Sequence, residues 1–232
     1  MRHEATSGPP APARSFLTGR MRWLMASLSL AVLVLVALAV IAGKRELFRG
    51  GVLVDRAAEA LADYGPAPSF ALVNQLGDSL HLADLRGRPW IADFIFTTCG
   101  SICPMMSAQF EQLSGQISPS VRLVSFSVDP ERDTPAKLAE YGAHYGATPE
   151  RWLLLTGDKP QIRRLAQEGF HLSVEDASPE DIASGAEPIL HSTRFVLVDA
   201  ETQIRGYYDG ADPEAVKQLQ VDLARLVRGE VP

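Results

Sequence analysis

The chain has 232 residues, of which 46% are hydrophobic, and a formal net charge of −6 at pH 7. This length predicts one membrane element and one globular domain, and no second enzyme domain is needed to account for it. Residues 1–42 carry a charge of +3 and the remainder −9, which excludes the basic surface that nucleic-acid binding requires.

The N-terminal region predicts a membrane anchor. Residues 1–22 are rich in proline and predict a short disordered cytoplasmic tail, whereas residues 23–42 are uncharged and long enough to cross a bilayer as one helix. Positive charges flank this segment equally on both sides, so the shortness of the tail decides the orientation. We expect a single-pass protein of a bacterial inner membrane with its soluble domain in the periplasm. A mitochondrial inner membrane, or a signal peptide cleaved after Ala42, is the alternative.

A linker follows the anchor. Residues 43–65 predict a helical stalk, because apolar residues over 53–64 recur with helical spacing. The run Gly65-Pro66-Ala67-Pro68 ends it. We therefore place the folded domain at residues 66–232.

The domain alternates strand and helix patterns. A turn that contains the two cysteines follows a buried strand, and the chain ends with a hairpin and a helix. This order of elements predicts an α/β fold with a thioredoxin-like mixed sheet flanked by helices. Residues 171–188 predict an irregular acidic insertion. Predicted strands cover 70–73, 79–82, 90–96, 121–128, 152–155, 194–198 and 203–208, and predicted helices cover 103–116, 135–146, 161–168 and 213–228.

Cys99 and Cys103 are the only cysteines of the chain. They lie in a Cys-x-x-x-Cys-Pro motif between a strand and the start of a helix, where the helix dipole favours thiolate over thiol. A spacing of four places both sulfurs on one helical face, so they can bind one soft metal ion or form a disulfide. A purely structural disulfide closing so short a loop would constrain little chain. Metal binding and thiol redox chemistry both remain open.

Two further residues are candidates for the site. His191 opens a strand predicted over 191–199, whose start should lie near the cysteine loop, so it is a candidate third ligand. Two thiolates with an imidazole suit copper as Cu(I) or Cu(II), whereas zinc usually takes a fourth ligand. Asp93 lies in an apolar strand six residues before Cys99, where a carboxyl group either accepts thiol protons or pairs with a polar neighbour.

Three motifs occur in this order: Phe96-Thr-Thr-Cys-Gly-Ser-Ile-Cys-Pro104, Ser127-Val-Asp-Pro-Glu-Arg-Asp-Thr-Pro135 and His191-Ser-Thr-Arg194. Together they resemble the Sco/SenC family over residues 66–228. Members of that family are thioredoxin-like, membrane-anchored copper proteins, so the resemblance implies that Cys99, Cys103 and His191 bind copper. Gly100-Ser101 replaces the usual Pro-Asp, and Leu190 replaces an acidic residue often found before the histidine.

The resemblance implies a non-enzymatic copper metallochaperone that helps assemble the binuclear copper centre of cytochrome c oxidase. Its expected partners are subunit II of that oxidase or another copper enzyme, a thiol-reducing protein and other copper chaperones. The alternative is an exported thiol-disulfide oxidoreductase or redox sensor in which Cys99 attacks and Cys103 resolves. His191 discriminates between the two, because dithiol exchange does not require it.

Overall fold

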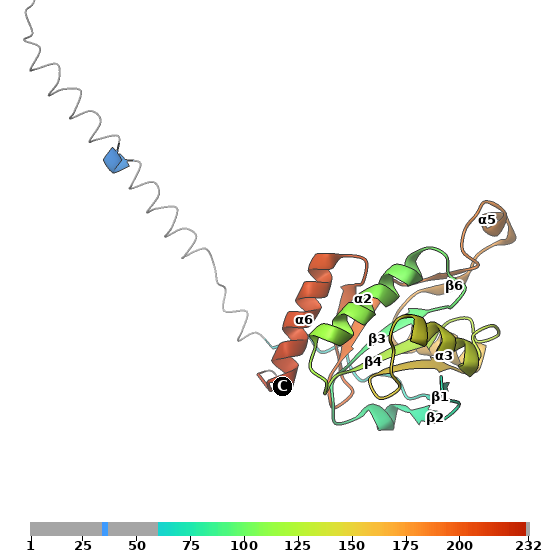
Figure 1. Cartoon of the computed structure of the whole chain (residues 1–232), viewed down its shortest axis with the longest axis horizontal. Helices are drawn as coiled ribbons and strands as arrows, with labels where there is room; N and C mark the ends of the chain where they lie inside the picture. The colour runs from blue at the N-terminus through green and yellow to red at the C-terminus, as the bar shows by residue number, and fades with distance from the viewer. Residues whose placement is uncertain (1–33, 37–59, 231–232) are drawn as a thin grey trace, which may run out of the picture. The chain divides into compact units, whose positions relative to one another are not determined.

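The computed structural model describes residues 34–36 and 60–230 (Figure 1). The predicted tail, the stalk up to residue 59 and all of the predicted span except the helical residues 34–36 lie outside the described residues. Among the residues that are described, no helix is both long and apolar enough to cross a bilayer.

The domain is built on a seven-stranded mixed sheet in the order β2-β1-β5-β4-β3-β8-β9. The three central strands β5, β4 and β3 run parallel, and the other neighbours pair antiparallel. This confirms the predicted mixed sheet. The strands are β1 (Ala71–Asn74), β2 (Ser79–His81), β3 (Trp90–Ile95), β4 (Arg122–Ser127), β5 (Trp152–Thr156), β8 (Arg194–Val198) and β9 (Ile204–Asp209).

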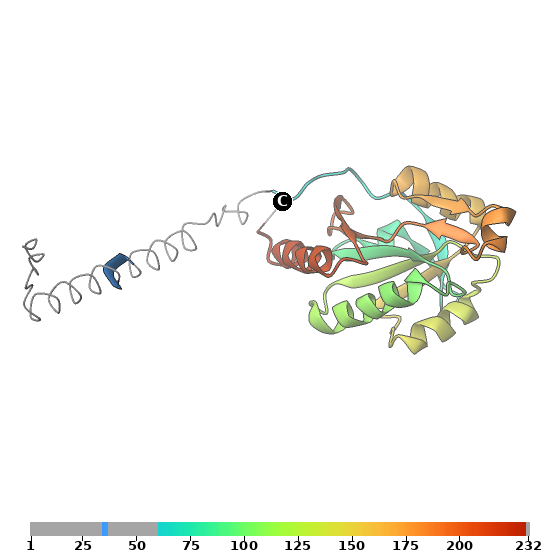
Figure 2. The same cartoon turned by 90° about the horizontal axis from the view of Figure 1, so that it is seen from above.

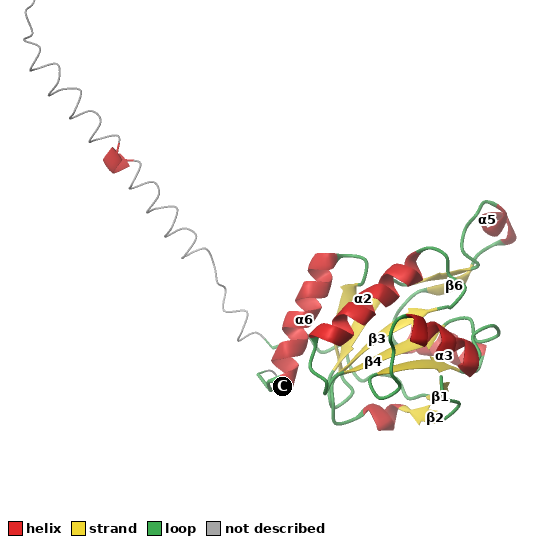
Figure 3. Cartoon of the chain, viewed as in Figure 1, coloured by secondary structure: helices red, strands yellow, loops and turns green. Residues whose placement is uncertain are grey.

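Helices cover both faces of the sheet, with α2 and α3 on one side and α4 on the other (Figure 2). In Figure 3, α2 and α3 lie in front of the strands. Thr134 and Asp158 begin α3 and α4, where each side chain accepts a hydrogen bond from a backbone N–H of the first turn and a proline follows. The helices are the 3₁₀ helix η1 (Leu82–Leu85), α2 (Ile102–Gln116), α3 (Pro135–His144), α4 (Lys159–Arg164), the π-helix η2 (Leu165–Gly169), α5 (Pro179–Ala183) and α6 (Pro213–Val227).

The core lies along the central strands, because both of their faces are covered. All six residues of β3 are buried, as expected for a central strand, and five of the six are apolar, the exception being Asp93. Phe94 stacks on Phe126 of β4 with ring centroids 5.1 Å apart, and Phe170 packs edge-on against Phe94 at 5.5 Å. This aromatic cluster fixes the position of β3. The segment between the end of β3 and the start of α2, which contains Cys99, is the cysteine loop.

The sheet topology brings the functional loops to one edge. The carboxyl ends of parallel strands β3 and β4 meet there, so the cysteine loop and the loop 128–134 are neighbours. Strand β8 is antiparallel to β3, so its beginning lies at the same edge. Residues directly before β8 are thereby brought close to the cysteines.

Two sequence predictions are wrong in this part of the domain. Residues 171–188 are not wholly irregular, because β6 (Val174–Asp176) pairs antiparallel with β7 (Ile189–His191) and α5 lies between them. His191 ends β7 and does not open the strand that follows. The Ser192 N–H still donates to the Ser173 carbonyl beyond the end of β7, and β8 begins only at Arg194.

The predicted stalk helix is absent from its described end, residues 60–64. This segment runs beside β9, where the Tyr64 N–H donates to the Ile204 carbonyl and the Ala67 N–H donates to the Thr202 carbonyl. Hydrogen bonds to the edge of the sheet replace those of a helix. The helix predicted over 161–168 exists, but it continues as a π-helix from Leu165.

Candidate metal centre

The side chains of Cys99, Cys103 and His191 converge at the edge of the sheet. Their donor atoms all lie within 4.8 Å of one another, and the Cys103 Sγ lies 3.1 Å from the His191 Nε2. Both cysteines are free thiols. Cys99 lies in the loop before α2, Cys103 lies in the first turn of α2, and His191 ends β7. The two residues whose side chains are in contact, Cys103 and His191, are 88 positions apart in the sequence.

The two sulfurs have different environments. Cys103 is fully buried, and burial raises the pKa of its thiol well above the ordinary value. Cys99 is 7% exposed. Burial also acts against ionisation of Cys99, but hydrogen bonds from the Cys103 N–H and from Ser101 outweigh it, so the pKa of the Cys99 thiol is lowered. Cys99 is therefore the more nucleophilic sulfur of the pair.

His191 is held in an orientation suited to metal binding. Its Nδ1 lies 3.0 Å from the Ser192 carbonyl oxygen, so Nδ1 carries the proton and donates it, which leaves the Nε2 lone pair directed at Cys103. Burial lowers the pKa of His191, which favours the neutral imidazole that metals bind. Phe96 packs its ring edge-to-face against the imidazole at a centroid distance of 5.6 Å.

Asp93 is fully buried in β3, and in the described part of the chain no hydrogen bond of good geometry reaches either carboxylate oxygen. Burial raises the pKa of Asp93 to about 7, a rise that the hydroxyl of Ser125 on the neighbouring strand only partly opposes. The charge on Asp93 also raises the pKa of the Cys103 thiol. The carboxyl group of Asp93 is therefore close enough to the Cys103 sulfur to affect its ionisation. Its one polar neighbour, Ser125, does not offset the effect of burial on the pKa of Asp93.

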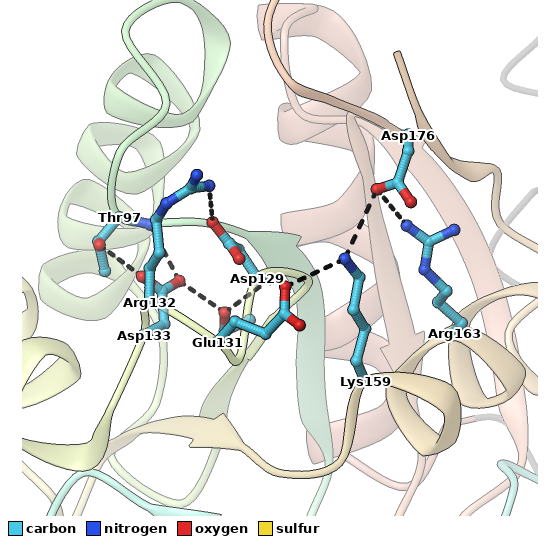
Figure 4. Close-up of polar contacts among 9 residues, drawn as sticks. Thr97, Asp129, Glu131, Arg132, Asp133, Lys159, Arg163 and Asp176 are labelled. Carbon is cyan, nitrogen blue, oxygen red and sulfur yellow. Dashed lines mark hydrogen bonds and ion pairs between the residues drawn. The ribbon is translucent and has the colours of Figure 1, made fainter. Parts of the chain in front are cut away.

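Asp133 fastens the cysteine loop to the end of β4 (Figure 4). Its carboxylate accepts hydrogen bonds from the Thr97 N–H, the Thr97 hydroxyl and the Ser127 hydroxyl. The helix α3 that follows is capped by the side chain of the next residue, Thr134.

A chain of ion pairs continues from this loop to the hairpin β6–β7 (Figure 4). Lys159 at the start of α4 lies 3.3 Å from Glu131 and 3.9 Å from Asp176 of β6. Arg163 makes a second ion pair with Asp176. Charged groups thus attach the hairpin that carries His191 to the body of the domain.

Glu187 is a residue of the site that the sequence analysis missed. Its Oε1 accepts a hydrogen bond of 3.0 Å from the Gly100 N–H, between the two cysteines. No signal in a single sequence reveals a contact between residues 87 positions apart.

The other methionines and histidines of the domain are not part of this cluster. Met106 is buried, Met105 is 38% exposed, and His81, His144 and His171 lie outside the cluster.

The donor set fits one soft metal ion. Metal bonds to thiolate sulfur and imidazole nitrogen are about 2.0 to 2.3 Å long, so donors within 4.8 Å of one another can share a single ion. Two thiolates with one imidazole and no carboxylate favour copper over the hard cations. The same two sulfurs also suit reversible disulfide formation.

Known proteins share this domain. A sequence model of SCO1/SenC proteins matches residues 59–228. The chain belongs to the SCO1/SenC family. The SCO1 protein homolog of Bacillus subtilis (strain 168) is 35% identical over 147 residues, which are 62% of this chain and 73% of the relative.

Solved structures of Sco proteins have the same fold. BsSco, a member of the Sco family of cytochrome c oxidase assembly proteins in which a disulfide switch was identified, has a TM-score of 0.61 and 31% identity, covering 72% of this chain and 95% of BsSco. Arabidopsis thaliana ScoI, solved with copper bound, has a TM-score of 0.58 and 25% identity, covering 71% of this chain and 99% of that one. The predicted thioredoxin-like fold and the family resemblance are confirmed.

Proposed function

We propose that this SCO1/SenC protein is a copper metallochaperone that binds one copper ion through Cys99, Cys103 and His191 and helps assemble the binuclear copper centre of cytochrome c oxidase. The convergence of two thiols and a correctly oriented imidazole within 4.8 Å carries the proposal. The copper bound to Arabidopsis ScoI and the oxidase assembly family of BsSco support it. Copper is the cargo of this reaction, and no bond of a substrate is broken.

Each residue has a distinct role in the proposed binding. Cys99 is the more exposed sulfur with the lowered pKa, so it meets incoming copper first and can be shared with a partner's thiolate during transfer. Cys103 must lose a proton before it can bind a metal. We assign Asp93 as the acceptor of that proton, because its carboxyl group is buried near this sulfur and has no strong hydrogen-bond partner in the described chain.

The proposed setting is the periplasmic face of a bacterial inner membrane, with residues 23–42 as the anchor. An oxidising compartment turns a close dithiol into a disulfide, so a thiol-reducing protein must act before copper binds. Subunit II of the oxidase is the proposed recipient, and other copper chaperones are the proposed donors.

Transfer to the recipient tests this proposal. Copper-loaded protein is mixed with the metal-free copper domain of subunit II, the two are separated, and the copper in each is measured together with the absorption of the binuclear centre. We expect copper to move to subunit II from the wild type, and to the same extent from the His144→Ala control, because His144 lies outside the cluster. Retention of all copper by the loaded protein, in the presence of reduced subunit II, would contradict the delivery role.

The difference between the two thiols favours a second candidate function, thiol-disulfide exchange. A nucleophilic Cys99 beside a buried Cys103 is the arrangement of an attacking and a resolving thiol. In that role the reduced, metal-free protein would reduce a disulfide in subunit II, and His191→Ala would leave the rate unchanged. The transfer experiment, repeated with metal-free protein and oxidised subunit II, separates this function from metal delivery.

A further inference from the structure

A hydrogen bond between a backbone N–H and a side chain joins the cysteine loop to the hairpin that carries His191, and neither of its two residues is a proposed copper ligand. In the described part of the chain, two hydrogen bonds connect residues 97–103 with residues 174–192. One is the contact between Cys103 and His191, which are both proposed ligands. The other is the 3.0 Å bond that Glu187 Oε1 accepts from the Gly100 N–H.

The position of Glu187 in the hairpin allows this hydrogen bond to determine where His191 lies relative to the cysteine loop. The hairpin is fastened at β6, where Asp176 pairs with Lys159 and Arg163. Glu187 lies two residues before the returning strand β7 and four residues before His191. A hydrogen bond at this point fixes the approach of β7 to the cysteine loop, whereas the ion pairs fix only the opposite strand.

The Glu187 carboxylate also lies near the imidazole. Burial lowers the pKa of His191, and the negative charge of Glu187 acts in the opposite direction. The hydrogen bond from the Gly100 N–H shows that this half-buried side chain is directed toward the cysteine loop. Ile182 and Leu190 of the same hairpin point outward, with 46% and 50% of their surface exposed.

We infer that Glu187 is a positioning residue for the metal centre, whose hydrogen bond to the Gly100 N–H holds the His191 hairpin against the cysteine loop and thereby strengthens copper binding. The inference rests on the proposed copper function. The proposed ligands bind one ion only if the hairpin and the cysteine loop lie together, and displacement of the Glu187 side chain alone would break the hydrogen bond that joins them. The hydrogen bond also requires a residue with a backbone N–H at position 100, because a proline there would have no N–H to donate.

Copper affinity tests this role, measured for the reduced full-length protein by competition with a coloured Cu(I) chelator. The variants are Glu187→Ala, Glu187→Gln, Gly100→Ala, His191→Ala and the double variant Glu187→Ala/His191→Ala. Glutamine keeps the accepting oxygen without the charge. Alanine at position 100 keeps the N–H, and its Cβ would lie 3.6 Å from Glu187 Oε1, an ordinary contact.

We expect Glu187→Ala to weaken copper binding about 10-fold, the lower end of the loss that follows removal of a group supporting a metal ligand. Glu187→Gln and Gly100→Ala should stay within about twofold of the wild type. Urea unfolding of the metal-free protein should be unchanged by all three substitutions, because Glu187 is half-buried and Gly100 is exposed, both outside the core. In the His191→Ala background, Glu187→Ala should have no further effect, because the residue acts through the histidine.

Other results overturn particular statements. If His191→Ala weakens binding and Glu187→Ala does not, the positioning role is wrong while the proposed ligand set stands. If His191→Ala leaves affinity intact, the proposed ligand set itself fails. If Glu187→Gln loses as much affinity as Glu187→Ala, or if Glu187→Ala weakens the His191→Ala variant equally, Glu187 does not act through the Gly100 hydrogen bond on His191.

Discussion

At the scale of single residues, the site separates two chemically similar thiols. Cys99 is stabilised as a thiolate by hydrogen bonds from Cys103 and Ser101, whereas Cys103 is buried near another acid, Asp93. The sequence alone identified both cysteines, because they are the only two and their motif lies at a helix start. It could not predict which thiol ionises first, since burial and hydrogen bonding depend on the folded environment.

We predict that Cys99 reacts before Cys103. Iodoacetamide attacks thiolates, so at pH 7.5 the reduced, metal-free protein should be alkylated first at Cys99 because of its lowered pKa and its partial exposure. Peptide mass mapping over time measures both rates. Cys103→Ala is a suitable control, because alanine keeps the backbone N–H that bonds the Cys99 sulfur. Equal rates, or faster alkylation of Cys103, would contradict the difference between the two thiols.

Asp93 should make stability depend on pH. Its native pKa of about 7 is raised above the unfolded value near 3.8, so the unfolded chain loses its proton first and stability falls as pH rises between these values. Between pH 5 and pH 8 this amounts to about 3 kcal/mol. Urea unfolding of metal-free wild type should show that fall, and Asp93→Asn should remove most of it. If the free energy of unfolding falls equally in the wild type and in Asp93→Asn, the pKa of Asp93 is not raised in the native protein and the prediction is wrong.

At the scale of elements, the site depends on loops fastened by buried polar groups. Asp133 joins the loop after β4 to the loop after β3 through Thr97 and Ser127. The strand and helix patterns of this region were sufficient to predict β3, α2, β4 and α3, because apolar runs and helix caps act locally. The pairing of Asp133 with Thr97 was not predictable, because it joins residues 36 positions apart.

Removal of Asp133 should destabilise the domain. Asp133→Ala deletes a buried acceptor of three hydrogen bonds and leaves the Thr97 and Ser127 donors without it, so we expect a loss of about 3 kcal/mol in the free energy of unfolding. Glu131→Ala removes an exposed carboxylate from the same loop and should cost less than about 0.5 kcal/mol. Urea unfolding of the metal-free proteins measures both, and equal losses would show that the Asp133 contacts carry no special stability.

The hairpin β6–β7 shows where local pattern was insufficient. Ser178, Pro179 and Asp181 form a capping box with a proline in the first turn, which is a readable start signal for α5. The strands on either side have only three residues each, too few for alternation to be distinguished from an irregular segment. His191 was therefore assigned to the following strand, although its proximity to the cysteines was expected.

At the scale of the whole molecule, the fold is a thioredoxin-like scaffold with a hairpin, which carries His191, inserted between the π-helix and β8. The scaffold places the cysteine loop at the end of the parallel strands, and the hairpin brings the histidine to the same edge. The scaffold and the family were predictable from the order of elements and three motifs. The proposed anchor over residues 23–42 follows from the sequence alone, and it would restrict copper delivery to partners at the same membrane.

The central claim is that one copper ion binds to Cys99, Cys103 and His191. The most direct test is titration of the reduced full-length protein with copper, with stoichiometry and affinity compared among Cys99→Ala, Cys103→Ala, His191→Ala and the control His144→Ala, an exposed histidine outside the cluster. We predict one copper per chain for the wild type and the control. Each ligand variant should lose more than the roughly 10-fold that removal of a supporting group costs. Full copper affinity in His191→Ala, or in either cysteine variant, would contradict the claim.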